Sequence, residues 1–182
     1  MVFSSPEFLY YFLPAVLGLY FIAPFKFKNI ILLTASLFFY FYGEQELVLI
    51  MVLSALSGWI HGLWIGKMRS SGRGRYAKIP LVSAVVVNLA FLVYYKYTDF
   101  FIRNINQLLG TNIKLLRIAL PIGISFYTFQ ILSYVFDVYK GQAEVQKNPI
   151  NILTYVTLFP QLIAGPIVRY TTVEKELTFR EH

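Results

Sequence analysis

The amino-acid sequence predicts an all-α integral membrane protein, a multispanning helix bundle with one interfacial helix and one broken or re-entrant helix. Hydrophobic residues make up 57% of the 182 residues and charged residues 14%, with a mean hydropathy of +0.60. A soluble core of this size would not bury so much apolar surface. The apolar residues also form long blocks, and Leu47–Gly66 alone would reach about 30 Å as a helix, roughly one hydrocarbon core.

The first apolar block, Phe8–Pro24, is expected to stay in the protein as a membrane helix. No Lys or Arg precedes Lys26, whereas a removable signal peptide carries basic residues in front of its apolar stretch. The second block, Asn29–Tyr42, is short for a spanning helix, and its aromatic end suits a headgroup interface. We therefore expect a tight helical hairpin around a loop that contains Lys26 and Lys28.

The charges of the loops predict one orientation in the membrane. The loop Lys67–Lys78 contains five basic residues and no acid, so the positive-inside rule places it in the cytoplasm. If the first four helices alternate, the loop with Lys26 and Lys28 is also inside, and the turn with Glu44 and Glu46 is outside. The amino terminus is then outside as well.

The fourth block, Ile79–Tyr95, is expected to return to the outer interface. In the next segment, Asp99–Ile118, apolar residues alternate with polar ones at helical spacing. This pattern predicts a helix that lies in the interface and stops at Gly110. The outer segment is basic, which departs from the positive-inside rule, and we interpret it as interfacial.

The fifth block, Leu120–Gly141, is predicted to re-enter the membrane. Pro121 suits a first helical turn, and Gly141 suits the stop after the last one. This crossing would bring the following residues back to the cytoplasm.

The last apolar block, Ile150–Val168, is predicted to be a broken or re-entrant helix. Asn148 suits its cap, but Pro160 and the pair Gly165–Pro166 interrupt it. Loose backbone at membrane depth requires cover from protein or a water-filled cavity. The polar tail, Tyr170–His182, is expected to be cytoplasmic or interfacial.

Several classes of site are excluded or disfavoured by the sequence. The chain has no cysteine, so disulfides, thiolate nucleophiles and Cys-ligated metals are excluded, and we predict no metal site. Phosphate-binding glycine loops, zinc-protease motifs and serine elbows are not found. The net charge of +7 lies in short loops beside apolar blocks, which indicates membrane topology and a lipid bilayer as partner, with no nucleic acid.

The two histidines are weak candidates for a catalytic base. His61 lies late in the third block among small and aromatic residues, and it has no visible carboxylate or other orienting partner. It is either an intramembrane proton-transfer base or, as we favour, a neutral interfacial histidine. His182, at the end of the polar tail, is poorly placed to be oriented.

The fifth block carries a polar face that is more informative. Its residues recur at spacings of three or four, which places them on one side of a helix: Gly123, Tyr127, Gln130, Tyr134 and Asp137, with Ser133 alongside. Polar groups at membrane depth are costly unless they are paired or hydrated, so this face is expected to point into the bundle or a cavity. The alternative is hydrogen bonding between helices without chemistry.

Two motifs in this order resemble the signatures of the membrane-bound O-acyltransferase family. They are the segment Leu-Pro-Ile-Gly-Ile-Ser-Phe-Tyr-Thr-Phe-Gln that begins at Leu120, and Phe-Pro-Gln-Leu-Ile-Ala-Gly-Pro-Ile-Val-Arg-Tyr over Phe159–Tyr170. The opening residues and the order of segments resemble the bacterial alginate O-acetyltransferase branch. Gln161 and Arg169, in the second motif, join Tyr127, Gln130, Ser133, Tyr134 and Asp137 as candidate cavity-lining residues.

The resemblance implies a multi-pass enzyme of the bacterial inner membrane. Such an enzyme takes an acyl (acetyl) group from a cytoplasmic donor, as substrate and not as bound cofactor, and acetylates an exported polysaccharide such as alginate with periplasmic partners. Residues 1–182 would then be the amino-terminal part of one polytopic domain, without its carboxyl-terminal half. The histidine that serves the family as base would lie beyond residue 182, so we expect no catalytic residue in this chain. A non-catalytic scaffold or export component, or a transporter, is the alternative.

Overall fold

The computed structural model describes residues 5–44, 47–164 and 168–178, which are helical without strands in these ranges. In chain order the elements are a π-helical turn Phe8–Phe12, α1 Leu13–Ile22, α2 Phe25–Gly43, α3 Val48–Ser70, a 3₁₀ turn Gly74–Ala77, α4 Lys78–Leu109, α5 Ile124–Lys140, α6 Pro149–Thr157, α7 Phe159–Ala164 and α8 Tyr170–Thr178. Two stretches, Val48–Ser70 and Gly74–Leu109, are long and apolar enough to cross a membrane.

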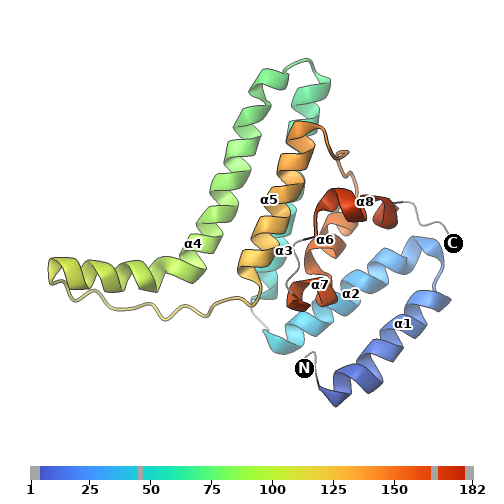
Figure 1. Ribbon diagram of the computed structural model, residues 1–182, viewed down its shortest axis with the longest axis horizontal. Helices are drawn as coiled ribbons and strands as arrows, with labels where there is room; N and C mark the ends of the chain where they lie inside the picture. Colours follow the sequence, from blue (N-terminus) through green and yellow to red (C-terminus); the bar gives the residue numbers. More distant parts are fainter. Residues whose placement is uncertain (1–4, 45–46, 165–167, 179–182) are drawn as a thin grey trace.

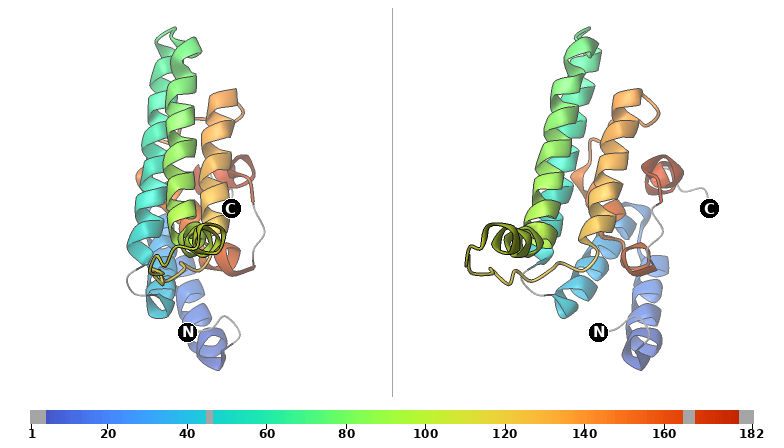
Figure 2. Two further views of the ribbon diagram at one scale, coloured as in Figure 1. Left: turned by 90° about the vertical axis from the view of Figure 1, so that its left-hand side faces the viewer. Right: turned by 60° about the vertical axis from the view of Figure 1, so that its left-hand side comes forward.

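Helices α3, α4 and α5 lie side by side, and the remaining helices gather beside them (Figure 1, Figure 2). A glycine stripe on α3, consisting of Gly58, Gly62 and Gly66, lets α5 and the segment after it approach closely. A Cβ atom at Gly62 would lie 2.6 Å from the hydroxyl oxygen of Tyr134, and one at Gly66 would lie 2.5 Å from a methyl group of Val145. Small residues at this spacing allow close helix packing, in particular between membrane helices.

Helix α4 is one bent helix rather than two separate segments. Its first part packs on α3 and α5, and its last part turns away from the bundle (Figure 1). In the second half of α4, the Thr98 hydroxyl donates to the carbonyl oxygen of Tyr94 at 2.6 Å, a contact of the kind that bends helices. The predicted stop at Gly110 is confirmed by its left-handed φ of 64°. Residues 111–118, which follow the predicted stop, form neither helix nor strand.

Helix α2 begins earlier than predicted. We placed Lys26 and Lys28 in a loop, but α2 starts at Phe25, so both are helical. The Lys28 stem is buried, with its ammonium nitrogen 5.0 Å from the centre of the Tyr20 ring. A lysine stem packs well on apolar surface, so its charge alone does not keep it out of a helix.

Two proline positions also differ from the prediction. Pro121 does not lie in the first turn of α5, because it forms a separate turn in which its carbonyl oxygen accepts from the amide of Ile124 at 3.2 Å. The last block is broken as predicted, but at Leu158, two residues before Pro160. The Pro160 ring would clash with a carbonyl four residues earlier, so the helix ends in front of it. The Asn148 cap is confirmed, since its side chain accepts from the amide of Ile150 at 3.0 Å.

The tail is helical and partly buried, although its composition is polar. Residues 170–178 form α8, and Tyr170 at its start is completely buried. The Asn29 amide of α2 ties this region together by donating to Asn151 Oδ1 at 2.8 Å and to the carbonyl oxygen of Leu177 at 3.0 Å. Gly165 and Pro166, the predicted interruption, lie outside the described residues, and so does His182.

Candidate functional site

The predicted polar face of α5 lies in the protein interior. Tyr127, Gln130, Tyr134 and Asp137 are all buried, and Ser133 is half-buried. Tyr134 packs against Gly62 of α3, while the rings of Phe126, Phe129 and Phe136 on α5 are exposed. Gly123, the remaining residue of the predicted set, is not part of the face but is the left-handed residue that precedes the helix.

Several polar atoms of this face have no hydrogen-bond partner within the part of the chain that the structure describes. They are the Tyr127 hydroxyl, Gln130 Oε1 and Asp137 Oδ2. Buried polar atoms in proteins are almost always satisfied, by protein or by ordered water. Helix α5 therefore presents a line of groups that require water, a ligand or further protein.

One end of α5 is fixed to the end of α2 by Glu44. Glu44 Oε2 accepts from the amide of Ile122 at 2.9 Å, and the Tyr40 hydroxyl donates to the carbonyl oxygen of Ile122 at 2.6 Å. The Glu44 carboxylate is also near enough to Tyr127 to interact with it electrostatically. This end of the polar face is thus positioned by a carboxylate from another helix.

The other end of α5 is fixed by Arg69 of α3. The Arg69 guanidinium donates to the carbonyl oxygen of Val138 at 2.7 Å, as expected for a cation at a helix carboxyl terminus. Gly141 then closes the helix with a φ of 75°, and a Cβ there would lie 2.5 Å from an Arg69 nitrogen. The basic residue and the glycine therefore meet at this end of the helix, one turn after Asp137.

Gln161 belongs to a different part of the interior. It lies in α7, is 8% exposed and lines a pocket of about 180 Å³ together with Thr154, Tyr155, Tyr20 and Leu158. Its amide nitrogen Nε2 has no partner among the described residues, although the Thr154 hydroxyl donates to the carbonyl oxygens of Ile150 and Asn29. The Gln161 pocket therefore combines apolar walls with an unused hydrogen-bond donor.

Tyr155 connects this pocket with the polar face of α5, and our sequence reasoning missed it. It lines the Gln161 pocket and is near enough to Asp137 to interact with it. With Tyr134 and Tyr170 it forms a tyrosine cluster, in which the Tyr170 ring centre lies 4.8 Å from that of Tyr134 and 5.4 Å from that of Tyr155. The signal was present, because Asn151, Thr154 and Tyr155 recur at helical spacing on α6.

The tyrosine cluster is fixed by hydrogen bonds to loop backbone and to Gln146. The Tyr155 hydroxyl donates to the carbonyl oxygen of Val168 at 2.6 Å, and the Gln146 amide Nε2 donates to the Tyr170 hydroxyl at 3.0 Å. Burial raises the pKa of Tyr170 to about 12, so this phenol stays protonated. Burial also raises the pKa of the nearby Glu174 carboxyl, whose Oε1 accepts from the amide of Glu144 at 3.2 Å.

Arg169 and His61 do not join these groups. Arg169 is exposed just before α8. His61 has orienting partners, contrary to our expectation: Nδ1 lies 2.7 Å from the Ser57 carbonyl oxygen, and Nε2 lies 3.0 Å from the Ser83 hydroxyl. A carbonyl only accepts, so we assign the proton to Nδ1, and the neutral ring then accepts from Ser83 at Nε2. Nδ1 is thus bonded within α3, and Nε2 joins α3 to α4.

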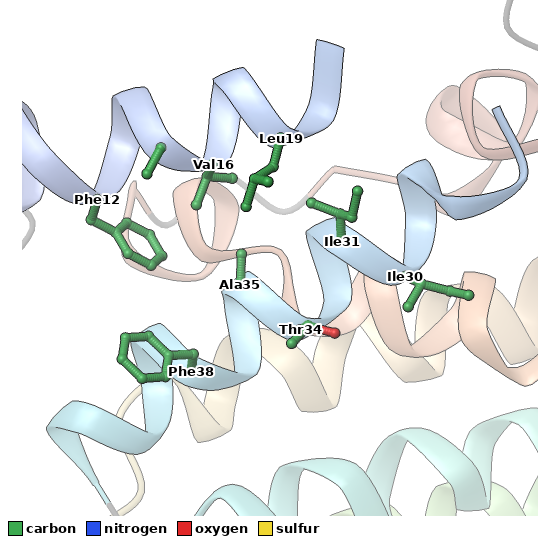
Figure 3. A pocket seen from close by; sticks show the side chains of 9 residues that line it. Phe12, Val16, Leu19, Ile30, Ile31, Thr34, Ala35 and Phe38 are labelled. Carbon is green, nitrogen blue, oxygen red and sulfur yellow. The ribbon is translucent and has the colours of Figure 1, made fainter. Parts of the chain in front are cut away.

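A groove between α1 and α2 is chemically plain. It has a volume of about 410 Å³, and Figure 3 shows the facing side chains, in which Thr34 supplies the hydroxyl among apolar neighbours such as Phe12 and Phe38. Its walls suit apolar contact and offer no acid, base or nucleophile. Among the described residues no group of His, Cys, Asp and Glu could hold a metal ion.

The described interior can therefore bind and orient a polar group, while it presents no assembled nucleophile and base. The polar groups available for binding lie on the polar face of α5, in the Gln161 pocket and at Tyr155 between them. All of the predicted lining residues except Ser133 and Arg169 are buried, and their role in lining a functional cavity stays a prediction.

Comparison with known proteins supplies the family. The chain is 39% identical to "Probable alginate O-acetylase AlgI" of Pseudomonas aeruginosa and 38% identical to the protein of that name in Azotobacter vinelandii, over its whole length in both cases. It is 30% identical, over 94% of its length, to "Peptidoglycan O-acetyltransferase" of Helicobacter pylori. It spans 35%, 37% and 37% of the length of these relatives, respectively. No protein-family model and no solved structure matches.

Identity at this level along an entire chain leaves no room for chance similarity, and it agrees with both motifs at Leu120 and Phe159. The chain belongs to the membrane-bound O-acyltransferase family, in its alginate O-acetylase branch.

Proposed function

We propose that this chain forms part of an O-acyltransferase that transfers acetyl groups to hydroxyls of an exported polysaccharide. The observation that carries the proposal is the identity with O-acetylases along the whole chain. Relatives with this similarity are named for alginate and for peptidoglycan, so a carbohydrate hydroxyl is the acceptor chemistry common to them. The acetyl donor is a substrate that arrives from the cytoplasm and is not a resident cofactor.

The chain supplies binding surfaces for this reaction, and the rest of the protein supplies the base. The acceptor oxygen attacks the acyl carbonyl, its proton passes to a base, and the donor's leaving group departs. His61 is unsuited to the proton transfer because both ring nitrogens are engaged, Nδ1 with the Ser57 carbonyl oxygen of α3 and Nε2 with the Ser83 hydroxyl of α4. The unpartnered atoms of Gln130, Asp137 and Gln161 are suited to hydrogen-bond substrate or the covering half of the protein.

We further propose a multi-pass topology in the bacterial inner membrane with the amino terminus outside. The support is the gathering of Lys67, Arg69, Arg73 and Arg75 at the end where α3 turns into α4. The cysteine-free chain allows a clean test with a single cysteine at the exposed Ser71. An impermeant thiol reagent should label it only after the cells are opened, and labelling in intact cells would reverse the orientation.

The role of the polar face is tested by Gln130→Leu in the complete protein, with Phe129→Leu as the matched control. Gln130 is buried, and the neighbouring Phe129 is 47% exposed. We expect Gln130→Leu to insert normally and to lose about tenfold or more of polymer acetylation, because its hydrogen-bonding group is removed from the interior. The control should acetylate normally. Normal acetylation by Gln130→Leu would show that the face only packs.

A second experiment tests whether the base comes from the rest of the protein. Residues 1–182 are expressed in cells without the endogenous enzyme, first alone and then with the remaining segment of the protein. We expect insertion without acetylation in the first case and recovery in the second, with periplasmic partner proteins present in both. Robust acetylation by the chain alone, abolished by His61→Ala, would contradict the proposed role of the missing segment and return His61 to the reaction.

A further inference from the structure

The end of α4 and the chain that follows it form an arm, residues 96–120, that projects from the bundle (Figure 1). The arm contains four cations, Lys96, Arg103, Lys114 and Arg117, against one carboxylate, Asp99. It lies at the same end of the bundle as the start of α5, opposite the basic turn between α3 and α4 (Figure 1). Under the proposed topology this end is outside, where the positive-inside rule disfavours such cations.

The helical part of the arm has two opposite faces. Lys96, Asp99, Arg103 and Asn106 recur every three or four residues and share one face. The other face presents large apolar side chains to the exterior, including Phe101, Ile105 and Leu108, which are 50%, 40% and 82% exposed. A helix of this kind lies in the interface with its apolar face toward the acyl chains.

The return segment of the arm is held on the polar face by two side chains. Asn106 Oδ1 accepts from the amide of Ile113 at 2.9 Å, and Asn106 Nδ2 donates to the carbonyl oxygen of the same residue at 2.8 Å. Asp99 Oδ1 accepts from the amide of Leu116 at 2.9 Å. These bonds place Lys114 and Arg117 beside the face that already carries Lys96 and Arg103.

Three of the arm cations are free to meet an anion, whereas the Lys96 ammonium donates to the Ser125 hydroxyl oxygen at 2.9 Å. Arg103, Lys114 and Arg117 are exposed, and no acid of the described residues forms an ion pair with them. Arg117 has a left-handed φ of 50°, which a non-glycine residue adopts at a cost and which commonly marks a functional position. The one carboxylate of the arm is occupied by the return segment.

We propose that the cationic face of the arm, formed by Lys96, Arg103, Lys114 and Arg117, binds the acceptor polysaccharide through its carboxylates. This inference rests on the proposed function and adds where an anionic polymer such as a polyuronate is held. The arrangement of faces favours the polymer over anionic lipid, because the cations lie opposite the side chains that enter the bilayer and so face the water. A field of one sign concentrates an oppositely charged ligand near the site.

The test measures binding of a fluorescent alginate oligosaccharide to the complete protein in nanodiscs of zwitterionic phosphatidylcholine. The arm variant is Arg103→Gln with Lys114→Gln and Arg117→Gln. The matched control, Lys67→Gln with Arg73→Gln and Arg75→Gln, removes the same charge at exposed positions of the opposite end. A second variant, Arg103→Lys with Arg117→Lys, keeps the charge.

We expect the arm variant to bind the oligosaccharide about tenfold or more weakly, and the wild type to lose affinity as salt rises from about 0.02 to about 0.3 M. The control and the charge-keeping variant should bind like the wild type. Unchanged binding by the arm variant, or equal binding of neutral dextran, would overturn the proposal. So would an arm variant that binds the oligosaccharide normally but loses retention on phosphatidylglycerol vesicles, since the surface would then serve lipid.

Kinetic measurements of acetyl transfer distinguish a failure of this inference from a failure of the proposed function. If the arm binds polymer, the arm variant should raise KM for the polymer about tenfold or more and leave kcat nearly unchanged. A wild type that binds the oligosaccharide but transfers no acetyl group would refute the proposed function and leave the binding surface intact. A variant with normal KM in an active enzyme would refute the surface alone.

Discussion

Helix α3 packs closely on α5 at glycines, which have no side chain, whereas α8 is attached to the bundle through hydrogen bonds. At the first contact, Gly58 and Gly62 leave room for Ile131 and Tyr134. At the second, the amide of Asn29 bonds Asn151 and the end of α8. Close approach gains dispersion contacts along a whole helix, while a hydrogen bond specifies one position of a short helix. The comparison predicts that added volume damages the first region most, and lost polar groups the second.

The largest effect is expected from Gly62→Ala. The new Cβ would lie 2.6 Å from the Tyr134 hydroxyl oxygen and 2.8 Å from a ring carbon, so α3 and α5 must separate. We expect a loss of roughly 1–3 kcal/mol in the free energy of unfolding, measured by denaturant titration in detergent. Gly18→Ala in α1, with nothing within 4 Å of its Cβ, is the control and should stabilise by about 0.5–1 kcal/mol. Equal effects at both glycines would refute close packing as the principle of this contact.

The sequence could predict the helices of the first region better than the attachments of the second. Apolar runs identified α3 and the start of α4, and glycines identified the ends of α4 and α5, because Gly110 and Gly141 adopt the left-handed conformation that other residues avoid. The glycine stripe itself was visible as a spacing of four, but only the structure shows which helix fills it. A spacing within one helix does not name its partner.

The attachments of α8 could not be predicted because they join residues far apart in the chain. Asn29 and Leu177 are 148 positions apart, and Tyr170 is buried by Tyr134 and Tyr155 from two other helices. The polar composition of the tail therefore indicated that the tail is exposed. It gave no sign that Tyr170 anchors the tail in the interior. For the same reason Tyr155 was not recognised as the link between Asp137 and the Gln161 pocket.

The next effect is expected from Asn29→Leu. The change removes the donor to Asn151 and to the carbonyl oxygen of Leu177, and it leaves the buried Asn151 amide oxygen unsatisfied. We expect a loss of about 1–3 kcal/mol, concentrated in α8. Spin labels at Lys26 and Thr172 should report a wider distance distribution between α2 and α8. Adding Asn151→Leu should recover part of the loss, and strict additivity of the two changes would show that the amides are not coupled.

A smaller effect is expected from Tyr155→Phe. The ring and its contact with Tyr170 remain, and the hydrogen bond to the carbonyl oxygen of Val168 is lost. We expect a loss of about 1 kcal/mol in unfolding free energy. The same substitution at the exposed Tyr94 should have no measurable effect. An equal loss at both positions would indicate that the Tyr155 hydroxyl does not stabilise the attachment.

The smallest effect concerns pH and the attachment of α8 through Glu174. Burial raises the pKa of this carboxyl, the charge of Glu144 raises it further, and the hydrogen bond from the Glu144 amide lowers it. Because the pKa of Glu174 is raised in the folded state, the protonated form of this carboxyl is the one that stabilises the attachment of α8. Attachment should therefore be strongest below the ordinary carboxyl pKa, weaken as pH rises through the raised value, and then stay constant.

The spin-label distance between α2 and α8 can follow this change between about pH 4 and pH 7, the range in which carboxyls of raised pKa titrate. Glu174→Gln mimics the neutral form, so it should hold α8 in place across the range and remove most of the pH dependence. The matched control is Glu144→Gln, which keeps the backbone amide that bonds Glu174 and removes only the repelling charge. It should shift the change to lower pH without abolishing it. A wild-type attachment that strengthens with rising pH would contradict the assigned direction, because the ionised carboxylate would then have to be the form that binds α8 to the bundle.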